Sequence, residues 1–175
     1  MPFTLFHFGP ALALGLPLRG YLHAPTFILA SLIIDVEPFF VLFFGLKYPL
    51  HGLLHTFLLA FFLGLFIGYL MFLLEGSLSP VYRAFLLESD KKMSLKSFMI
   101  AGTTGILLHV LSDSPLYDDI QPFYPLLINP LYNPALSPII YDIFMWAWVL
   151  GIIYYSYLII LKQRRKEPPS IFHRN

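Results

Sequence analysis

A histidine and an aspartate, His109 and Asp113, stand four residues apart in a segment that is otherwise apolar. On an α-helix this spacing puts both side chains on the same face. Ionisable side chains are costly inside a membrane span and usually mark a functional site. Because an imidazole and a carboxylate on one face can bind the same metal ion, the pair predicts a buried metal site.

Other apolar segments carry the remaining candidate ligands. His51 and His55 share the four-residue spacing, and on one helix face they would offer two nitrogens to one ion. His7 and Asp35 each lie in apolar sequence. The complete predicted ligand set is His7, Asp35, His51, His55, His109 and Asp113, and the sequence leaves open which of His51 and His55 contacts the ion.

The types of donor in this set narrow the chemistry. The chain has no cysteine, so thiolate ligands and disulfides are excluded. Nitrogen and oxygen donors without sulfur are typical of a hydrolytic zinc or manganese centre, where the ion activates water and polarises a carbonyl or phosphoryl oxygen. A surplus of donors over four allows one ion or two. An acid outside the ligand set would orient a ligand or act as general base, with Glu37 the leading case, and Asp119 is expected to cap a turn or orient a ligand.

The composition of the chain identifies the setting of this site. Of 175 residues, 58% are hydrophobic, 18% aromatic and only 12% charged, which is about half the charged fraction of a soluble domain. The composition predicts one all-α domain in a lipid bilayer, residues 1–162, followed by a basic cytoplasmic tail, 163–175. The net charge is +1, and basic residues are not interleaved with exposed aromatics, so no nucleic-acid partner is expected. The N-terminus lacks the basic region of a signal peptide and is expected to be retained.

The elements that must position the ligands follow from runs of apolar sequence. A helix needs about 20 residues to span a bilayer, and four segments qualify: 25–45, 50–74, 97–113 and 139–161. A shorter helix at 4–17, with Thr4 as N-cap, is expected to be re-entrant or packed within the bundle. Pro38 is expected to kink the first span. The polar segment 75–97 predicts a surface loop with one short interfacial helix, and the proline-rich segment 114–138 predicts an ordered outer loop over the mouth of the bundle.

The distribution of positive charge predicts an orientation. If the four spans alternate and the tail is cytoplasmic, every Lys and Arg except Lys47 lies on the cytoplasmic side, as the positive-inside rule requires. The predicted ligands His51, His55, His109 and Asp113 then fall towards the outer ends of their helices. His23, beside Arg19, is expected at the cytoplasmic surface.

Four short motifs, in order, resemble a known family. These are Met1-Pro-Phe-Thr-x-x-His7-x-Gly-Pro10, then Asp35-Val-Glu37-Pro38, then Tyr48-Pro-x-His51-Gly-x-x-His55, then Leu108-His109-x-Leu-x-Asp113-x-Pro-Leu-Tyr117 with Asp119-Ile-x-Pro-Phe and Asn129-Pro-Leu. They look like the YdjM-like family of inner-membrane-associated metal-dependent hydrolases. The resemblance implies a multi-pass protein of the inner (cytoplasmic) membrane with its site towards the outer leaflet. It also implies that Tyr117, Asp119 and Asn129 surround the ligands or face substrate.

The order of an N-terminal His, an Asp, a His and a closing H-x-x-x-D is also similar to zinc-dependent phospholipase C. This more distant resemblance implies zinc ligands at the predicted positions and a catalytic, bridging role for Asp113. Because the only histidine after His109 is His173, one or two ions are expected rather than three. The leading hypothesis is a hydrolase of a phospholipid or lipid-linked phosphoester. The alternative is a transporter or metal-ion channel that uses the same residues as a transit site.

Overall fold

The structure is a computed structural model, and it describes residues 5–89 and 91–166. Thr4, the proposed N-cap, and the predicted tail from residue 167 onward lie outside the described residues. The elements are α1 (Leu5–Gly15), η1 (Pro17–Gly20), α2 (Ala24–Ile33), α3 (Val36–Phe44), η2 (Leu53–His55), α4 (Phe57–Ala84), α5 (Leu95–Asp113), η3 (Pro134–Leu136) and α6 (Ser137–Lys166). Within the described residues, four helical segments are long and apolar enough to cross a membrane, which confirms the predicted all-α membrane bundle.

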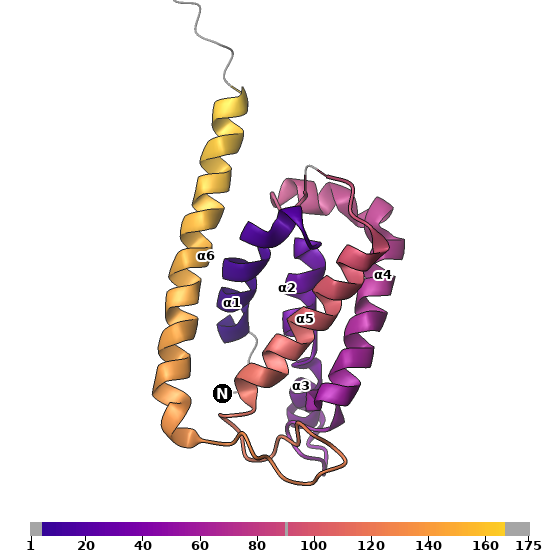
Figure 1. The fold of residues 1–175 in the computed structure, drawn as a ribbon, viewed down its shortest axis with the longest axis vertical. Helices are drawn as coiled ribbons and strands as arrows, with labels where there is room; N and C mark the ends of the chain where they lie inside the picture. The colour runs from indigo at the N-terminus through magenta and orange to yellow at the C-terminus, as the bar shows by residue number, and fades with distance from the viewer. Residues whose placement is uncertain (1–4, 90, 167–175) are drawn as a thin grey trace, which may run out of the picture.

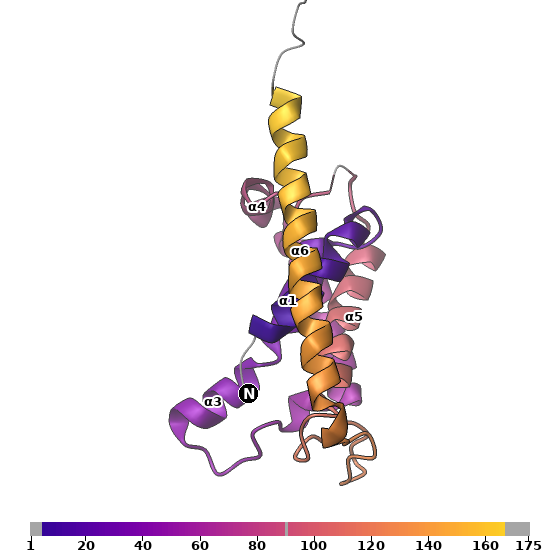
Figure 2. The same ribbon diagram turned by 90° about the vertical axis from the view of Figure 1, so that its left-hand side faces the viewer.

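The first predicted span is broken into α2 and α3 rather than kinked at Pro38. The break falls at Ile34 and Asp35, one turn before the proline. Proline has no N–H to bond the carbonyl four residues earlier, and the freed carbonyl of Ile34 accepts from the Glu37 N–H instead, at 3.1 Å. Figure 2 shows α3 standing out to one side of the bundle.

The second span begins later than predicted. Residues 50–56 form turns and the short η2, and α4 starts at Phe57 with the Thr56 side chain accepting the Leu59 N–H as N-cap. The prediction that His51 and His55 share one α-helix face is therefore wrong. A Ser or Thr hydroxyl favours the start of a helix, and Pro49 and Gly52 disfavour helix before it.

Helices α4 and α5 pack at very short range through small residues. A β-carbon on Gly64 would lie 2.5 Å from the Thr103 Cα, and one on Gly68 would lie 2.6 Å from the Phe98 carbonyl oxygen. Gly64 and Gly68 form a G-x-x-x-G pair, a spacing whose small residues let two helices approach this closely. The close approach fixes α5, and therefore His109 and Asp113, against the helix that follows His55.

The two ends of the bundle differ in character. The last part of α4 turns across one end, which it shares with η1, residues 85–89 and 91–94, and the C-terminal end of α6 (Figure 1). These segments carry most of the Lys and Arg residues predicted on the cytoplasmic side; Lys96 lies in the first turn of α5, and Arg174 lies outside the described residues. The proline-rich loop and the end of α5 lie at the other end, as does the connection with Lys47. Helix α6 begins at Ser137, two residues before the predicted start at Ile139, and it packs mainly against α1, which lies inside the bundle as predicted.

Candidate metal centre

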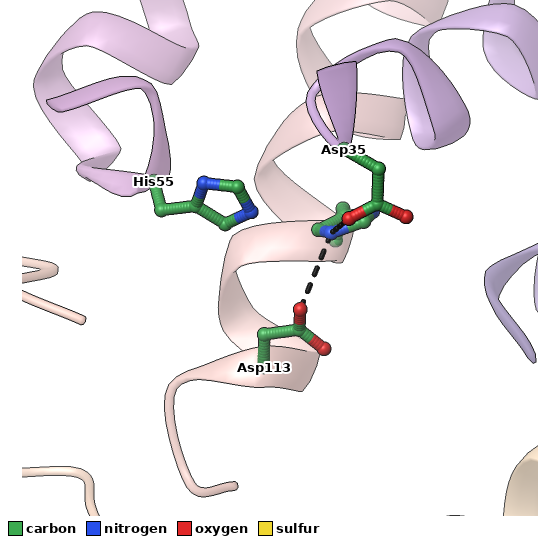
Figure 3. Close-up of side chains that lie close together, drawn as sticks. Asp35, His55 and Asp113 are labelled. Carbon is green, nitrogen blue, oxygen red and sulfur yellow. Dashed lines mark ion pairs between the residues drawn. The ribbon is translucent and has the colours of Figure 1, made fainter. Parts of the chain in front are cut away.

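Four buried side chains from three parts of the chain meet near the loop-covered end of the bundle. Asp35 lies at the α2–α3 break, His55 ends η2, and His109 and Asp113 lie on the last turns of α5. One ligand atom from each lies within 4.8 Å of the others. Figure 3 shows Asp35, His55 and Asp113 pointing toward one another. All four belong to the predicted ligand set.

The His109 ring is oriented by a backbone carbonyl. Its Nδ1 lies 2.7 Å from the carbonyl oxygen of Ser31, which can only accept, so Nδ1 carries the proton. Its Nε2 lies 3.3 Å from both Asp35 Oδ1 and Asp113 Oδ2. Neither approach has hydrogen-bond geometry, and the buried Nε2 has no hydrogen-bond partner in the described part of the chain.

The His55 ring is oriented in the same way by a carboxylate. Its Nδ1 donates to Glu37 Oε2 at 2.9 Å. Burial lowers the pKa of His55, an effect that outweighs the opposing hydrogen bond to Glu37. The ring is therefore neutral, with a lone pair on a buried Nε2 that again lacks a hydrogen-bond partner within the described residues.

These four groups fit a divalent cation. With both imidazoles neutral, two lone pairs would face two carboxylates, so acceptors would face acceptors and the net charge would be −2. Protonation of His109 would balance one of the two charges and leave Nε2 of His55 unpaired. A divalent ion would satisfy both charges and both nitrogens, and buried charge requires such compensation. Metal-binding histidines commonly donate their other N–H to a carboxylate or carbonyl, as His55 and His109 do here.

His7 lies beside this cluster. Its Nε2 is 3.0 Å from Asp113 Oδ1, and its ring stacks on His109 with 3.7 Å between centroids. The two oxygens of Asp113 therefore face different histidines. His7 therefore lies next to the other predicted ligands, as expected. It does not belong to the group of four residues whose ligand atoms lie within 4.8 Å of one another.

His51 is held one step away from the cluster. Its backbone N–H and its Nδ1 both contact the Asp119 carboxylate, each at 2.9 Å. Its ring centroid lies 4.9 Å from that of His55 and 4.2 Å from that of Tyr117. His51 and Asp119 also line a cavity of about 220 Å³ together with Tyr48. Of the two alternatives left open by the sequence, His55 joins the four-residue group and His51 faces the cavity.

The acids and polar residues predicted around the ligands have distinct positions. Glu37 accepts from the N–H groups of Gly52 and Leu54 as well as from His55, so it holds the η2 turn and the His55 ring in place. Burial alone would raise the pKa of Asp119, but the hydrogen bonds from His51 lower it. Burial raises the pKa of the Tyr117 phenol, which is neutral.

Asn129 organises the proline-rich loop rather than the ligands. Its side-chain N–H groups donate to the carbonyls of Ser114 and Tyr117, and its oxygen accepts the Leu131 N–H. These bonds fix the turn that follows Asp113. Asn129 was predicted to surround the ligands or face substrate. In the structure its hydrogen bonds hold the proline-rich loop over this end of the bundle.

Two features of the structure were missed by sequence reasoning. The Ser31 carbonyl that orients His109 has no sequence signal, because any residue could supply it. His23 is buried, not at the surface as predicted: its Nδ1 accepts the Thr26 N–H at 3.3 Å as N-cap of α2, and its Nε2 lies 3.1 Å from Glu75 Oε2. Its position directly before Ala24-Pro25, at a helix start, is the signal that could have indicated this.

No protein-family model, no curated protein and no solved structure matches this chain.

Proposed function

We propose that this chain is a membrane-embedded, metal-dependent hydrolase that cleaves a phosphoester of a lipid or lipid-linked substrate. The observation that carries the proposal is the buried group of two unpaired imidazole nitrogens and two carboxylates, whose charge and acceptor atoms call for a divalent cation. Nitrogen and oxygen donors in this proportion suit zinc, with manganese the alternative.

Asp35, His55, His109 and Asp113 would hold the ion. The second oxygen of Asp113 faces His7, so these two residues could hold a second ion on that side. When bound, such an ion supplies an acidified water and polarises a phosphoryl oxygen. The chain's own residues fix the ligands: Ser31 and Glu37 hold the Nδ1 protons, which leaves both Nε2 atoms directed at the same point.

His51 is the residue best placed to accept a proton from the attacking water. Its Nδ1–H is held by Asp119, so its Nε2 carries the lone pair. It lines the cavity next to the cluster, and a histidine held by a carboxylate is the usual arrangement of a general base. We therefore assign proton transfer to His51 and ligand orientation to Glu37.

The position of the site supports an amphipathic substrate. The cluster lies towards one end of a bundle whose helices are apolar on the outside, and α3 beside it exposes Phe43 and Phe44, 70% and 61% accessible. A lipid-linked substrate could place its acyl or prenyl portion against such a surface and its phosphoester at the end of the bundle. A soluble phosphoester would not use this apolar surface.

The test is hydrolysis by the purified full chain in vesicles of mixed phospholipids, with zinc or manganese and with a chelator. We expect released phosphate or head group that disappears with chelator, and at least a 100-fold loss of turnover in His55→Ala. Asp118→Asn, an exposed acid on the neighbouring loop, is the matched control and should retain activity.

His51→Gln separates the two assigned roles. It should keep stoichiometric metal but lose turnover, with the loss greatest near neutral pH where an imidazole base operates. A chain that binds the metal and conducts it across vesicles without any turnover would replace the hydrolase by a transporter. A chain that binds neither zinc nor manganese would refute both.

A further inference from the structure

A basic cavity lies at the end of the bundle opposite the metal centre. It has a volume of about 200 Å³ and lies between η1, the end of α4 and the C-terminal part of α6. Its polar lining consists of Arg19, Arg83, Lys162 and Glu88, and its apolar lining consists of leucines, including Leu86 and Leu158. Three cations and one anion line the same space.

The charges in this cavity do not cancel. Arg83 forms two hydrogen bonds with Glu88, at 2.9 and 3.2 Å, so this pair is neutral as a unit. Among the described residues, Arg19 donates only to the Leu86 carbonyl, and the exposed Lys162 has no ion-pair partner. Two positive charges are therefore left to face an anion.

A second, apolar cavity is lined by neighbouring residues of the same two segments as the basic one. It has a volume of about 290 Å³ and is lined by Phe8, Leu12, Ile28, Phe85, Leu87 and Tyr155. Residues 85–87 and helix α6 line both cavities. Phe85 and Leu87 line the apolar cavity and Leu86 the basic one, while α6 contributes Tyr155 to the first and Lys162 to the second.

Hydrogen bonds hold residues 85–87 against α6 and against η1. The Tyr155 hydroxyl donates to the Phe85 carbonyl at 2.9 Å, and Arg19 Nη1 donates to the Leu86 carbonyl at 3.3 Å. Leu86 adopts a φ of 59°, a left-handed conformation that is costly for a leucine and that turns the chain between the two carbonyls. The segment that lines both cavities is thus held in a defined conformation.

We propose that these cavities together bind one acidic diacyl phospholipid. Its phosphate would lie between Arg19 and Lys162, and an acyl chain would run along α6 past Tyr155 into the apolar cavity. Tyr155 and Lys162 are seven residues apart on one helix, which separates them by about 10 Å along its axis. The polar end lies at the rim of the bundle and the apolar end within it, which is how a phospholipid is oriented in a leaflet. Basic pockets between membrane helices are suited to acidic head groups.

Such a lipid would tie α6 to the bundle. Helix α6 packs mainly against α1, and Tyr155 on α6 donates to the carbonyl of Phe85, the residue that follows α4. A lipid seated between Arg19 and Lys162 would add a bridge across the same gap. We therefore expect acidic phospholipid to raise thermal stability as well as to bind.

The experiment is native mass spectrometry of the delipidated full chain in neutral detergent, titrated with phosphatidylglycerol or phosphatidylcholine. We expect one phosphatidylglycerol to bind at least tenfold more tightly than phosphatidylcholine. Each cation near an acidic head group contributes about a fivefold effect, so Lys162→Gln should weaken binding about fivefold and Arg19→Gln with Lys162→Gln about 30-fold. The matched control, Lys92→Gln with Lys96→Gln, removes two cations at the same end and should change binding less than twofold.

Three results would overturn the proposal. One is equal affinity for the two lipids, and another is an equal loss in the matched control, which would indicate general surface charge. The third is displacement of the lipid by inorganic phosphate at equal concentration, which would indicate a free-anion site. Because Lys162 is exposed, Lys162→Gln should fold even if loss of the Arg19 hydrogen bond unfolds the double variant. Binding, not turnover, is measured, so the outcome is independent of the hydrolase proposal.

Discussion

Removal of one carboxylate from the metal centre should change stability in opposite directions with and without metal. Asp35→Asn keeps the shape of the side chain and removes one of two buried negative charges, whose ligand oxygens lie within 4.8 Å of each other. At an effective dielectric constant of about 20, two like charges at this distance repel by about 3 kcal/mol. The neutral amide also avoids the desolvation cost of a buried carboxylate.

Without metal, Asp35→Asn should therefore be more stable than the wild type by about 1–3 kcal/mol. With zinc at about 1,000 times its dissociation constant, the wild type gains about 4 kcal/mol, and the variant gains much less because it has lost a charged ligand. The order of stability should then reverse. The assay is thermal and denaturant unfolding in detergent, followed by far-UV circular dichroism, with chelator and with zinc.

A different outcome would show that the cluster is an ion pair centred on a protonated His109. In that case Asp35→Asn would be less stable than the wild type under both conditions, because it breaks an attraction to the imidazolium, and zinc would change neither protein. Asp118→Asn, which removes an exposed charge nearby, is the control and should be close to neutral in both conditions.

Three further substitutions test one group that orients a ligand and two features of the fold. Glu37→Gln should weaken zinc binding 10–100-fold without removing a ligand, measured by competition with a chelating dye, and unchanged affinity would refute its role in orienting His55. Gly64→Val should destabilise the α4–α5 contact by about 2 kcal/mol, measured by unfolding, whereas Gly76→Ala, where a β-carbon meets nothing within 4 Å, should be neutral. Burial lowers the pKa of His23 to about 4, so stability from this residue is complete above pH 6.5 and is lost as pH falls towards 4. The loss is at most about 3 kcal/mol, and His23→Asn, which can still cap α2, should reduce the pH dependence between pH 7 and 5 if this assignment is right.

The membrane bundle and most of the ligands could be predicted from the sequence because each has a strong local signal. Long apolar runs identify spans, and ionisable residues within them stand out against that background. The pairing of His109 with Asp113 required only the helical spacing, and the structure keeps it. The prediction that basic residues gather at one end followed from alternation of the spans alone.

The errors arose where local signals competed. His51 and His55 have the spacing of a helix face, but Thr56 caps α4, which starts only after them. His55 is therefore positioned by η2 and not by an α-helix. Long-range hydrogen bonds decided the rest. Which of the two histidines joins the ligands depends on whether Glu37 or Asp119 holds the ring, and nothing in the linear order of these residues reveals that pairing.

One proline accounts for the way in which two acids reach the same site. Asp35 and Glu37 are two residues apart, and in an unbroken helix they would point to different faces. Because Pro38 cannot donate to the Ile34 carbonyl, the helix ends there and restarts after Asp35, which becomes the N-cap residue of α3. Asp35 can then face His109, while Glu37, in the first turn of α3, faces His55. The break thus supplies both a ligand and the group that orients another ligand, which a continuous span through these residues would not allow.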